Sequence, residues 1–257
     1  MLNILLFLFC SSFSVHALPR AISDHEAFNI IKVVDDKQRN SGDYKANCYI
    51  KETEREKEPR VYQSVVYRRD ADDKFMILFI KPKEEAGKGY LKIDKNLWMY
   101  DPGTGKWDRR TEREKIAGTN SRRSDFDESR LSEEYDVKFN SIDKLGSYDA
   151  YKIDLVVKKG VDVAYPRIVM WVDAKDNNLL KRDEYALSGK LMRTTFYPKW
   201  AKKYSPSKGT DVWVPQEMRI FDKLEIGTST IILIKEVDLN SLPANIFTKA
   251  WLESKSR

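Results

Sequence analysis

The side chains that carry out acid–base, nucleophilic or metal chemistry are sparse in this sequence. Histidine occurs only at His16 and His25, and cysteine only at Cys10 and Cys48. A catalytic triad, a Cys–His pair or a multi-histidine zinc site needs several such residues converging on one place, and the sequence has no Gly-x-Ser-x-Gly elbow. It therefore predicts neither a metal nor a cofactor, and it favours a binding protein over an enzyme.

A second group of residues, GTGKW at positions 103–107, contains the glycines and lysine of a phosphate-binding loop without its spacing. Tyr100 stands where the first glycine of Gly-x4-Gly-Lys-Ser/Thr should be, and Trp107 follows the lysine. A turn between two strands explains these residues fully. The stretches DADD at 70–73 and DAKDNN at 173–178 are too short and loosely spaced for a calcium loop.

The first 17 residues, MLNILLFLFCSSFSVHA, predict export from the cytoplasm. They contain no Lys, Arg, Asp or Glu, and their short apolar run is followed by small and polar residues up to Ala17, which is the layout of a cleaved signal peptide. The run is too short to span a bilayer, which takes about 20 residues. We expect a periplasmic protein of residues 18–257 in one domain; the alternative is a lipid anchor on Cys10.

Most of the remaining sequence predicts strands. Short runs such as RVYQSVVYRR, KFMILFIKP, RIVMWVDA and STIILIKEVDL alternate with turn signals such as DADD, DPGTG and SPSKGT. Helical patterns appear near the two ends: Ser23-x-x-Glu26 is a capping box, and Ile246, Phe247, Ala250 and Trp251 share one helical face. A long twisted sheet must curl, close or split. If it curls into a partial, half-open β-barrel, the two helices are candidate lids or fillers of its concave side.

Several strands are apolar on both faces, which is unusual for a sheet with one solvated side. In LWMY, residues 97–100, one face would carry Leu97 and Met99 and the other Trp98 and Tyr100. Such strands suit either an ordinary two-sided core or the wall of an apolar cavity. The predicted cavity wall consists of Trp98, Tyr100, Phe79, Ile77, Ile168 and Met170.

The segment GTNSRRSDFDESRLSEEYD, residues 118–136, gathers arginines, carboxylates and two apolar residues. One interpretation is a helical turn that carries surface ion pairs of small energetic value. The other is a latch, or a contact for a ligand head group, formed by Asp125, Phe126, Asp127 and Arg130. Both interpretations remain open at the level of sequence.

The stretch GKGYLKIDKNLWMYDPGTGKWDRRT, followed by GTNSRRSDFDESRL, resembles the bacterial outer-membrane lipoprotein-sorting proteins, the LolA-like group. The resemblance extends over nearly the whole chain after the leader. It implies an incomplete antiparallel barrel whose cavity holds the acyl chains of lipoproteins in transit between membranes. It also implies two protein partners, an inner-membrane exporter and an outer-membrane acceptor.

The distribution of charged residues argues against one class of function, nucleic-acid binding. The net charge is +6, with 46 basic and 40 acidic residues that alternate along the chain, whereas nucleic-acid binding would need a concentrated basic stripe. The leading hypothesis is a periplasmic carrier that binds acyl chains of lipoproteins or lipids and moves them towards the outer membrane. The alternatives are an exported surface adhesion or interaction protein and a carboxylate-dependent envelope enzyme.

Overall fold

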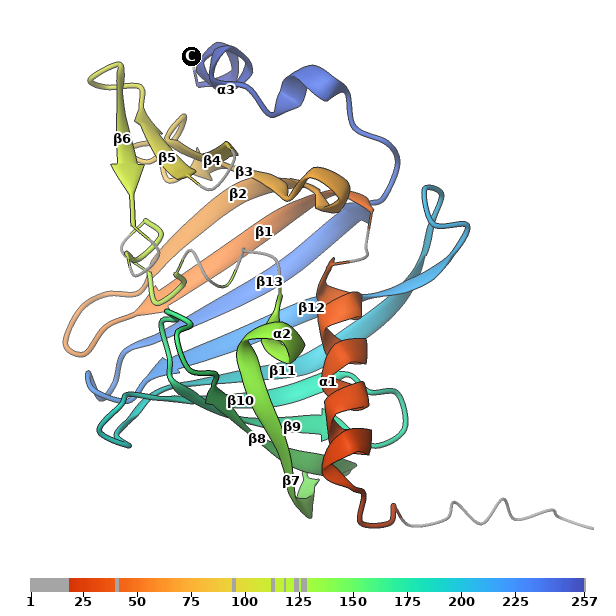
Figure 1. Cartoon of the computed structure of the whole chain (residues 1–257). Coiled ribbons are helices and arrows are strands. Elements are labelled where there is room, and N and C mark those ends of the chain that lie inside the picture. The colour runs from red at the N-terminus through yellow and green to blue at the C-terminus, as the bar shows by residue number, and fades with distance from the viewer. Residues whose placement is uncertain are drawn as a thin grey trace, which may run out of the picture.

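One antiparallel sheet of 13 strands dominates the protein (Figure 1). The computed structural model describes residues 19–39, 42–93, 96–111, 114–117, 119–122, 125 and 129–256. The predicted signal peptide, with Cys10, and the residues Phe126 and Asp127 lie outside these ranges. The strands are β1 (Asp43–Thr53), β2 (Arg60–Arg69), β3 (Lys74–Lys81), β4 (Gly89–Ile93), β5 (Asn96–Asp101), β6 (Lys106–Arg110), β7 (Tyr135–Leu145), β8 (Tyr148–Val157), β9 (Arg167–Asp173), β10 (Leu179–Tyr185), β11 (Leu191–Ser205), β12 (Thr210–Asp222) and β13 (Ser229–Asp238).

The sheet is strongly curved but does not close. Its strand order runs β6-β5-β4-β3-β2-β1-β13-β12-β11-β10-β9-β8-β7, so β6 and β7 form the two edges. Two meanders meet where β1 pairs with β13, and Cys48 there lies opposite Ile234. This is the predicted half-open antiparallel barrel. In the part of the chain that the structure describes, no helix is long and apolar enough to cross a membrane.

Helix α1 (Asp24–Arg39) lies on the concave side, against the half of the sheet formed by β7–β11 (Figure 1). The predicted capping box begins it: the Glu26 amide donates to Ser23 Oγ over 3.2 Å, and the Ser23 amide donates to Glu26 Oε2 over 2.8 Å. Ala27, Ile31 and Val34, spaced at helical intervals, are buried against this half of the sheet.

The C-terminal segment lies on the outer side of the sheet. It is not one helix but a 3-10 turn (Ala244–Ile246) followed by helix α3 (Lys249–Lys255). Thr248 separates them and caps α3 by accepting a hydrogen bond from the Trp251 amide. Leu252 packs with outward-facing residues of β2–β4. The prediction that this helix covers the concave side is therefore wrong, because its apolar face is buried on the opposite surface.

Strands β6 and β7 are the two edges of the sheet, and the described residues of the connection between them, the crossing connection, lie on its concave side (Figure 1). Within this connection, the Asn120 amide donates to Thr230 Oγ1 of β13 over 2.9 Å, which fixes this point against the inner surface. The connection ends in the short helix α2 (Leu131–Glu134), which precedes β7.

Candidate ligand-binding site

A cavity of about 140 Å³ lies on the concave side, between the half of the sheet that α1 covers and the half that it leaves open. Because a water molecule needs roughly 10–15 Å³ in this measure, the cavity has room for roughly ten waters. Its lining is mostly apolar with a few polar groups, as small-molecule sites usually are. The lining residues are Gln38, Tyr44, Cys48, Val66, Arg68, Asp125, Arg182, Tyr197, Trp200, Pro215, Met218, Ile232 and Ile234.

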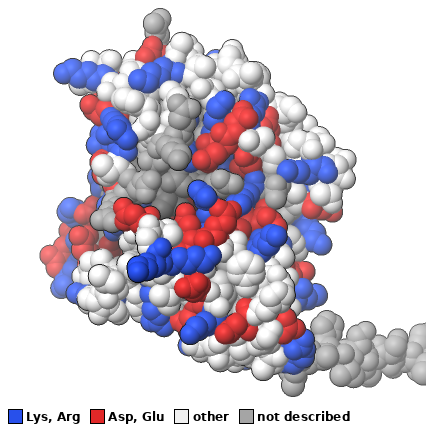
Figure 2. All heavy atoms as spheres, viewed as in Figure 1, with Lys and Arg blue, Asp and Glu red and all other residues white. Residues whose placement is uncertain are grey.

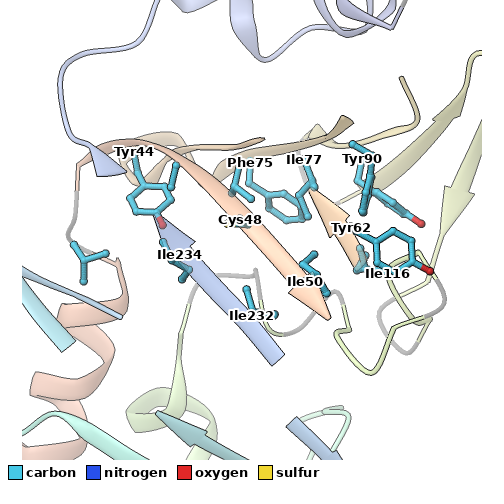
Figure 3. Close-up of a cluster of buried hydrophobic side chains, with 14 of the residues drawn as sticks. Tyr44, Cys48, Ile50, Tyr62, Phe75, Ile77, Tyr90, Ile116, Ile232 and Ile234 are labelled. Carbon is cyan, nitrogen blue, oxygen red and sulfur yellow. The ribbon is translucent and has the colours of Figure 1, made fainter. Parts of the chain in front are cut away.

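Strand alternation supplies the apolar lining. In β1, Tyr44, Ala46, Cys48 and Ile50 are buried, while the residues between them are exposed or half-buried. The register then sets Ile50 opposite Ile232 of β13. Figure 3 shows these side chains on the same inner surface as Phe75 and Ile77 of β3. A period of two along each strand thus turns one face of several strands into a continuous apolar wall.

A small recess continues the cavity beneath the crossing connection. It has a volume of about 20 Å³, close to that of one water molecule in this measure. Cys48, Val66 and Ile232 line both the recess and the larger cavity, so the two spaces adjoin. The remaining lining residues of the recess are Ile50, Ser64, Ile77, Phe79, Ile116, Thr119 and Ser121.

The titratable groups in the apolar lining are uncharged at neutral pH. Burial raises the pKa of the Cys48 thiol to about 12. Burial also raises the pKa of Tyr44 and of Tyr197 above the ordinary value of 10. The wall therefore offers a ligand an apolar surface and no reactive thiolate.

A buried ion network closes one side of the cavity. Arg193 Nη1 and Nη2 donate to Asp125 Oδ2 and Oδ1 over 2.8 and 2.7 Å, and Arg193 also bonds both carboxylate oxygens of Glu184. Arg182 Nη2 donates to Asp125 Oδ1 over 3.2 Å, and its Nε lies 3.0 Å from Glu184 Oε1. Two positive and two negative side chains thus balance one another away from water.

The arginines determine the ionisation of Asp125. Burial alone would raise the pKa of this carboxyl group, but Arg193 and Arg182 outweigh burial and hold the pKa below its ordinary value of 3.8. The arginines remain charged, because burial lowers the Arg193 pKa less than Asp125 and Glu184 raise it. Asp125 therefore fixes the crossing connection to β10 and β11 through a permanent charge pair.

A second carboxylate, Asp35, fastens α1 to the end of the same connection. It is buried, and it accepts hydrogen bonds from Ser129 Oγ, the Leu131 amide, the Ser132 amide and Ser132 Oγ, over 2.6, 3.0, 2.8 and 2.7 Å. Helix α1 and the crossing connection are consequently joined to each other as well as to the sheet.

Four of the predicted wall residues face the concave side. Ile77 and Phe79 line the recess, next to the cavity. Ile168 and Met170 are buried beneath α1, in the cluster that contains Ala27 and Ile31, and are not among the cavity-lining residues. Whether any of the four contacts a ligand remains a prediction.

Trp98 and Tyr100 lie on the other face of the sheet. Tyr100 packs in the outer cluster that includes Leu252 of α3, and Lys249 Nζ of α3 lies 4.0 Å from the centroid of the Trp98 ring. The inner face of this strand carries Leu97 and Met99 instead. Trp98 and Tyr100 are therefore not part of the concave wall, because α3 occupies the side to which they point.

The predicted head-group residues fall in different surroundings. Asp125 lines the cavity and is 4% exposed, so it is not part of an exposed ion-paired latch. Arg130 is about half exposed and pairs with Glu133 over 2.8 Å at the start of α2. Phe126 and Asp127 lie outside the described residues.

Sequence reasoning missed the residues that complete the cavity. Met218 and Trp200 come from the two long strands β12 and β11 in the interior of the sheet, and Gln38 comes from the last turn of α1. The one sequence pattern that indicated part of the cavity was the alternation of apolar and polar residues in β1. Cys48 and every second residue on either side of it are buried on the inner face. Among the described residues, no group of three or more His, Cys, Asp or Glu side chains is placed to hold a metal ion.

Solved structures share this architecture. The fold is that of LolA-like proteins: a LolA superfamily protein from Nitrosomonas europaea superposes with a TM-score of 0.71 at 19% identity, covering 90% of this chain and 100% of the other. A putative outer membrane lipoprotein-sorting protein domain from Vibrio parahaemolyticus gives 0.76 at 18% identity, covering 90% and 99%. A DUF1329 family protein from Desulfovibrio piger gives 0.78 at 19% identity, covering 90% and 100%.

Sequence comparison identifies the family itself. The model of a family described as "uncharacterized protein" matches residues 71–254, more than half of the chain, and the chain belongs to that family. No curated protein matches the sequence.

Proposed function

We propose that the protein is an exported carrier that binds acyl chains of lipids or lipid-modified proteins in the concave cavity and moves them across the periplasm towards the outer membrane. The observation that carries this proposal is the apolar part of the cavity lining, around Cys48, Met218 and Ile232, where burial keeps the Cys48 thiol uncharged. Each CH₂ group that leaves water for such a lining contributes about 0.8 kcal/mol, so burial alone drives uptake.

The arrangement of α1 and the crossing connection supports a route for loading and release. Both elements lie on the concave side, and Asp35 joins them through four hydrogen bonds. A bulky lipid enters when this side of the barrel widens, while the continuous sheet behind the cavity keeps its register. The outer side of β2–β5, against which α3 packs, takes no part in this exchange.

Transfer between membranes requires a donor and an acceptor, and we propose an inner-membrane exporter and an outer-membrane acceptor in these roles. Basic and acidic side chains are interspersed over the face that bears α1 (Figure 2). A surface of mixed charge suits polar, reversible contacts with protein partners. It is less suited to tight binding to a surface that carries charges of one sign. The described residues of this face form no continuous basic stripe of the kind that binds nucleic acids.

The first experiment tests cargo binding and transfer. The protein is purified from the envelope fraction of a bacterial host without detergent, and its extract is examined by mass spectrometry for acyl lipids. Transfer of a fluorescent acyl phospholipid from donor to acceptor vesicles is then followed with and without the protein. Co-purified acyl lipid and faster transfer are the expected results. A protein that retains no acyl lipid and leaves the transfer rate unchanged is not a carrier.

The second experiment tests export. Cleavage after Ala17 predicts that the mature protein, recovered from the periplasmic fraction, begins at Leu18. A mature chain that begins at an acylated Cys10 would instead establish the anchored alternative.

A further inference from the structure

A second, polar pocket lies on the concave side of β3–β6, in the half of the sheet that α1 leaves uncovered (Figure 1). Its volume of about 260 Å³ gives room for about twenty water molecules at roughly 10–15 Å³ each. Tyr90 of β4 lines it and lies on the same inner surface as Ile77 of β3 (Figure 3). The described lining residues are Phe79, Glu85, Lys88, Tyr90, Met99, Arg110, Lys115 and Ala117.

Cations dominate the charged residues of this basic pocket. Among the described lining residues, Lys88, Arg110 and Lys115 stand against one carboxylate, Glu85. The cations come from the turn between β3 and β4, from the last residue of β6 and from the crossing connection. Their side chains are 26%, 32% and 35% exposed, so they are accessible to a ligand, unlike the arginines of the buried network.

The carboxylates beside these cations leave them free to bind a further anion. Arg110 Nη1 donates to Glu114 Oε2 over 3.2 Å, and Lys115 Nζ lies 3.9 Å from the Glu225 carboxylate, which is 66% exposed. Lys88 pairs over 3.1 Å with the one carboxylate of the lining. Ion pairs at such exposure are weak, and ammonium and guanidinium groups have several N–H donors each. A phosphate group therefore has donors to bind while these pairs persist.

Hydrogen bonds hold the crossing connection at the basic pocket. The Ala117 amide donates to the Tyr90 hydroxyl over 3.0 Å. Two residues earlier, Lys115 forms an antiparallel bridge with Arg122 of the same connection. The ammonium group of Lys115 is thus placed at the pocket by the fold, together with the guanidinium group that β6 supplies.

The three spaces on the concave side follow one another in the order of the strands. Phe79 lines both the basic pocket and the recess, and Cys48 lines both the recess and the cavity. Because neighbouring strands lie about 4.8 Å apart, the three steps from Cys48 on β1 to Tyr90 on β4 cover about 14 Å along the sheet. A long acyl chain spans such a distance, so the apolar lining leads to cations within reach of one lipid.

We propose that the basic pocket binds the phosphate of a lipid head group while the acyl chain of the same lipid occupies the cavity. This inference rests on the proposed function and specifies its ligand: acyl lipids with a phosphate-bearing head group, in preference to uncharged acyl glycerols. The recess, at about 20 Å³, is narrower than a chain. The crossing connection, whose Ile116 lines the recess, therefore has to move outwards to admit a lipid that joins the two sites.

Three ligands test the inference: 1-dodecanoylglycerol 3-phosphate, the uncharged 1-dodecanoylglycerol, and glycerol 3-phosphate, which lacks the chain. The lipids are titrated below the concentrations at which they form micelles, and they differ only in the phosphate, so their affinity ratio isolates its contribution. We expect the wild type to bind the phosphate lipid at least about tenfold more tightly than the uncharged lipid, as hydrogen bonds to a charged group would give. Added salt should reduce this preference, because it screens part-exposed charges.

The variants Arg110→Gln and Lys115→Gln, singly and together, should reduce the preference for the phosphate lipid, with the double variant approaching a ratio of one. Affinity for 1-dodecanoylglycerol and the melting temperature should stay near their wild-type values, since the ion pairs lost are part-exposed. Arg219→Gln is the matched control. Arg219 is 48% exposed and pairs with Glu217 over 2.6 Å, but it is not among the described residues that line the basic pocket or the cavity. It should keep the wild-type ratio.

The outcomes separate this inference from the proposed function. If neither lipid binds, the carrier function itself fails. If both lipids bind equally well, or if the double variant or Arg219→Gln changes the ratio no differently from the other, the head-group site is overturned while the carrier function stands. If glycerol 3-phosphate binds as tightly as the phosphate lipid, the pocket takes free phosphate, and its assignment to a lipid head group is overturned.

Discussion

Arg193 of β11 donates a hydrogen bond to each carboxylate oxygen of Asp125, with N–O distances of 2.7 and 2.8 Å. Each of the two side chains is only 4% exposed. This is a buried, two-point ion pair between the sheet and the connection that crosses its concave side. Such pairs are strong only when both members are present, because either charge alone is costly to bury. The fixed position of the crossing connection therefore depends on both residues.

Replacing Asp125 with Asn should destabilise the protein by about 3–5 kcal/mol, because it leaves the network with an uncompensated positive charge. Urea unfolding followed by tryptophan fluorescence measures the loss. Arg130→Gln is the matched comparison, since Arg130 pairs with Glu133 at a half-exposed position and such pairs contribute about 0–1 kcal/mol. Equal, small losses in the two variants would mean that the buried pair does not hold the connection.

Asp125 should also make stability fall in acid. Its pKa in the folded protein is below the ordinary value of 3.8, so its contribution is full above 3.8 and is lost as the pH falls through the lower, folded-state pKa. The free energy of unfolding of the wild type minus that of Asp125→Asn should thus be constant near neutral pH and shrink in acid below pH 3.8. A difference that stays constant from pH 6 to pH 2 would contradict this.

Glu52 should behave in the opposite way. Its side chain is 2% exposed, and burial raises its pKa above 4.5 despite Arg60, 3.2 Å away. A raised folded-state pKa means that the contribution to stability is full below 4.5 and is lost as the pH rises through the folded value. Glu52→Gln should therefore increase the free energy of unfolding at pH 7 and leave it unchanged at pH 3. A variant less stable than the wild type at pH 7 would show that the ion pair with Arg60 dominates.

Local signals in the sequence predicted the elements well. Ser23 and Glu26 form the capping box that the spacing predicts, because both partners of that motif lie within one helical turn. Thr248 shows a limit of the same reasoning: the apolar spacing of the last segment predicts one helix, but the threonine side chain caps a new one in its middle.

Contacts between residues far apart in the sequence could not be predicted from the sequence. Trp98 and Met99 are both apolar, so alternation separates them onto two faces but does not say which face is concave; the docking of α3 decides that. Asp125 lies 68 residues from Arg193 in the sequence, and nothing near either residue indicates the other. The cavity is likewise built from strands whose neighbours are known only once the sheet is assembled.

A substitution at Trp98 tests whether a ligand binds on the outer face of the sheet. Trp98→Ala removes the ring beneath Lys249 and should cost roughly 1–3 kcal/mol, less than a fully buried tryptophan, because Trp98 is only half-buried. Binding of dodecanoylglycerol per folded molecule should not change. Thermal unfolding and ligand titration of the same sample give both values, and weaker binding at unchanged folding would place a ligand on the outer face.

Filling the cavity tests the concave face directly. Met218 lines it and is half-buried, so Met218→Trp would place a bulky indole ring into the space that an acyl chain needs, without removing a hydrogen bond. Because the added atoms enter a cavity rather than a packed core, the stability change should stay within about 1 kcal/mol, below the usual cost of overpacking. Affinity for dodecanoylglycerol should fall at least about tenfold, which corresponds to about 1.4 kcal/mol.

The control is Met192→Trp, which makes the same replacement at another half-buried methionine that does not line the cavity. It should leave affinity near the wild-type value. Equal affinity in wild type, Met218→Trp and Met192→Trp would mean that the ligand binds elsewhere on the protein. Loss of binding in Met218→Trp alone, with the fold intact by circular dichroism, would locate the acyl chain between β12 and the open half of the sheet.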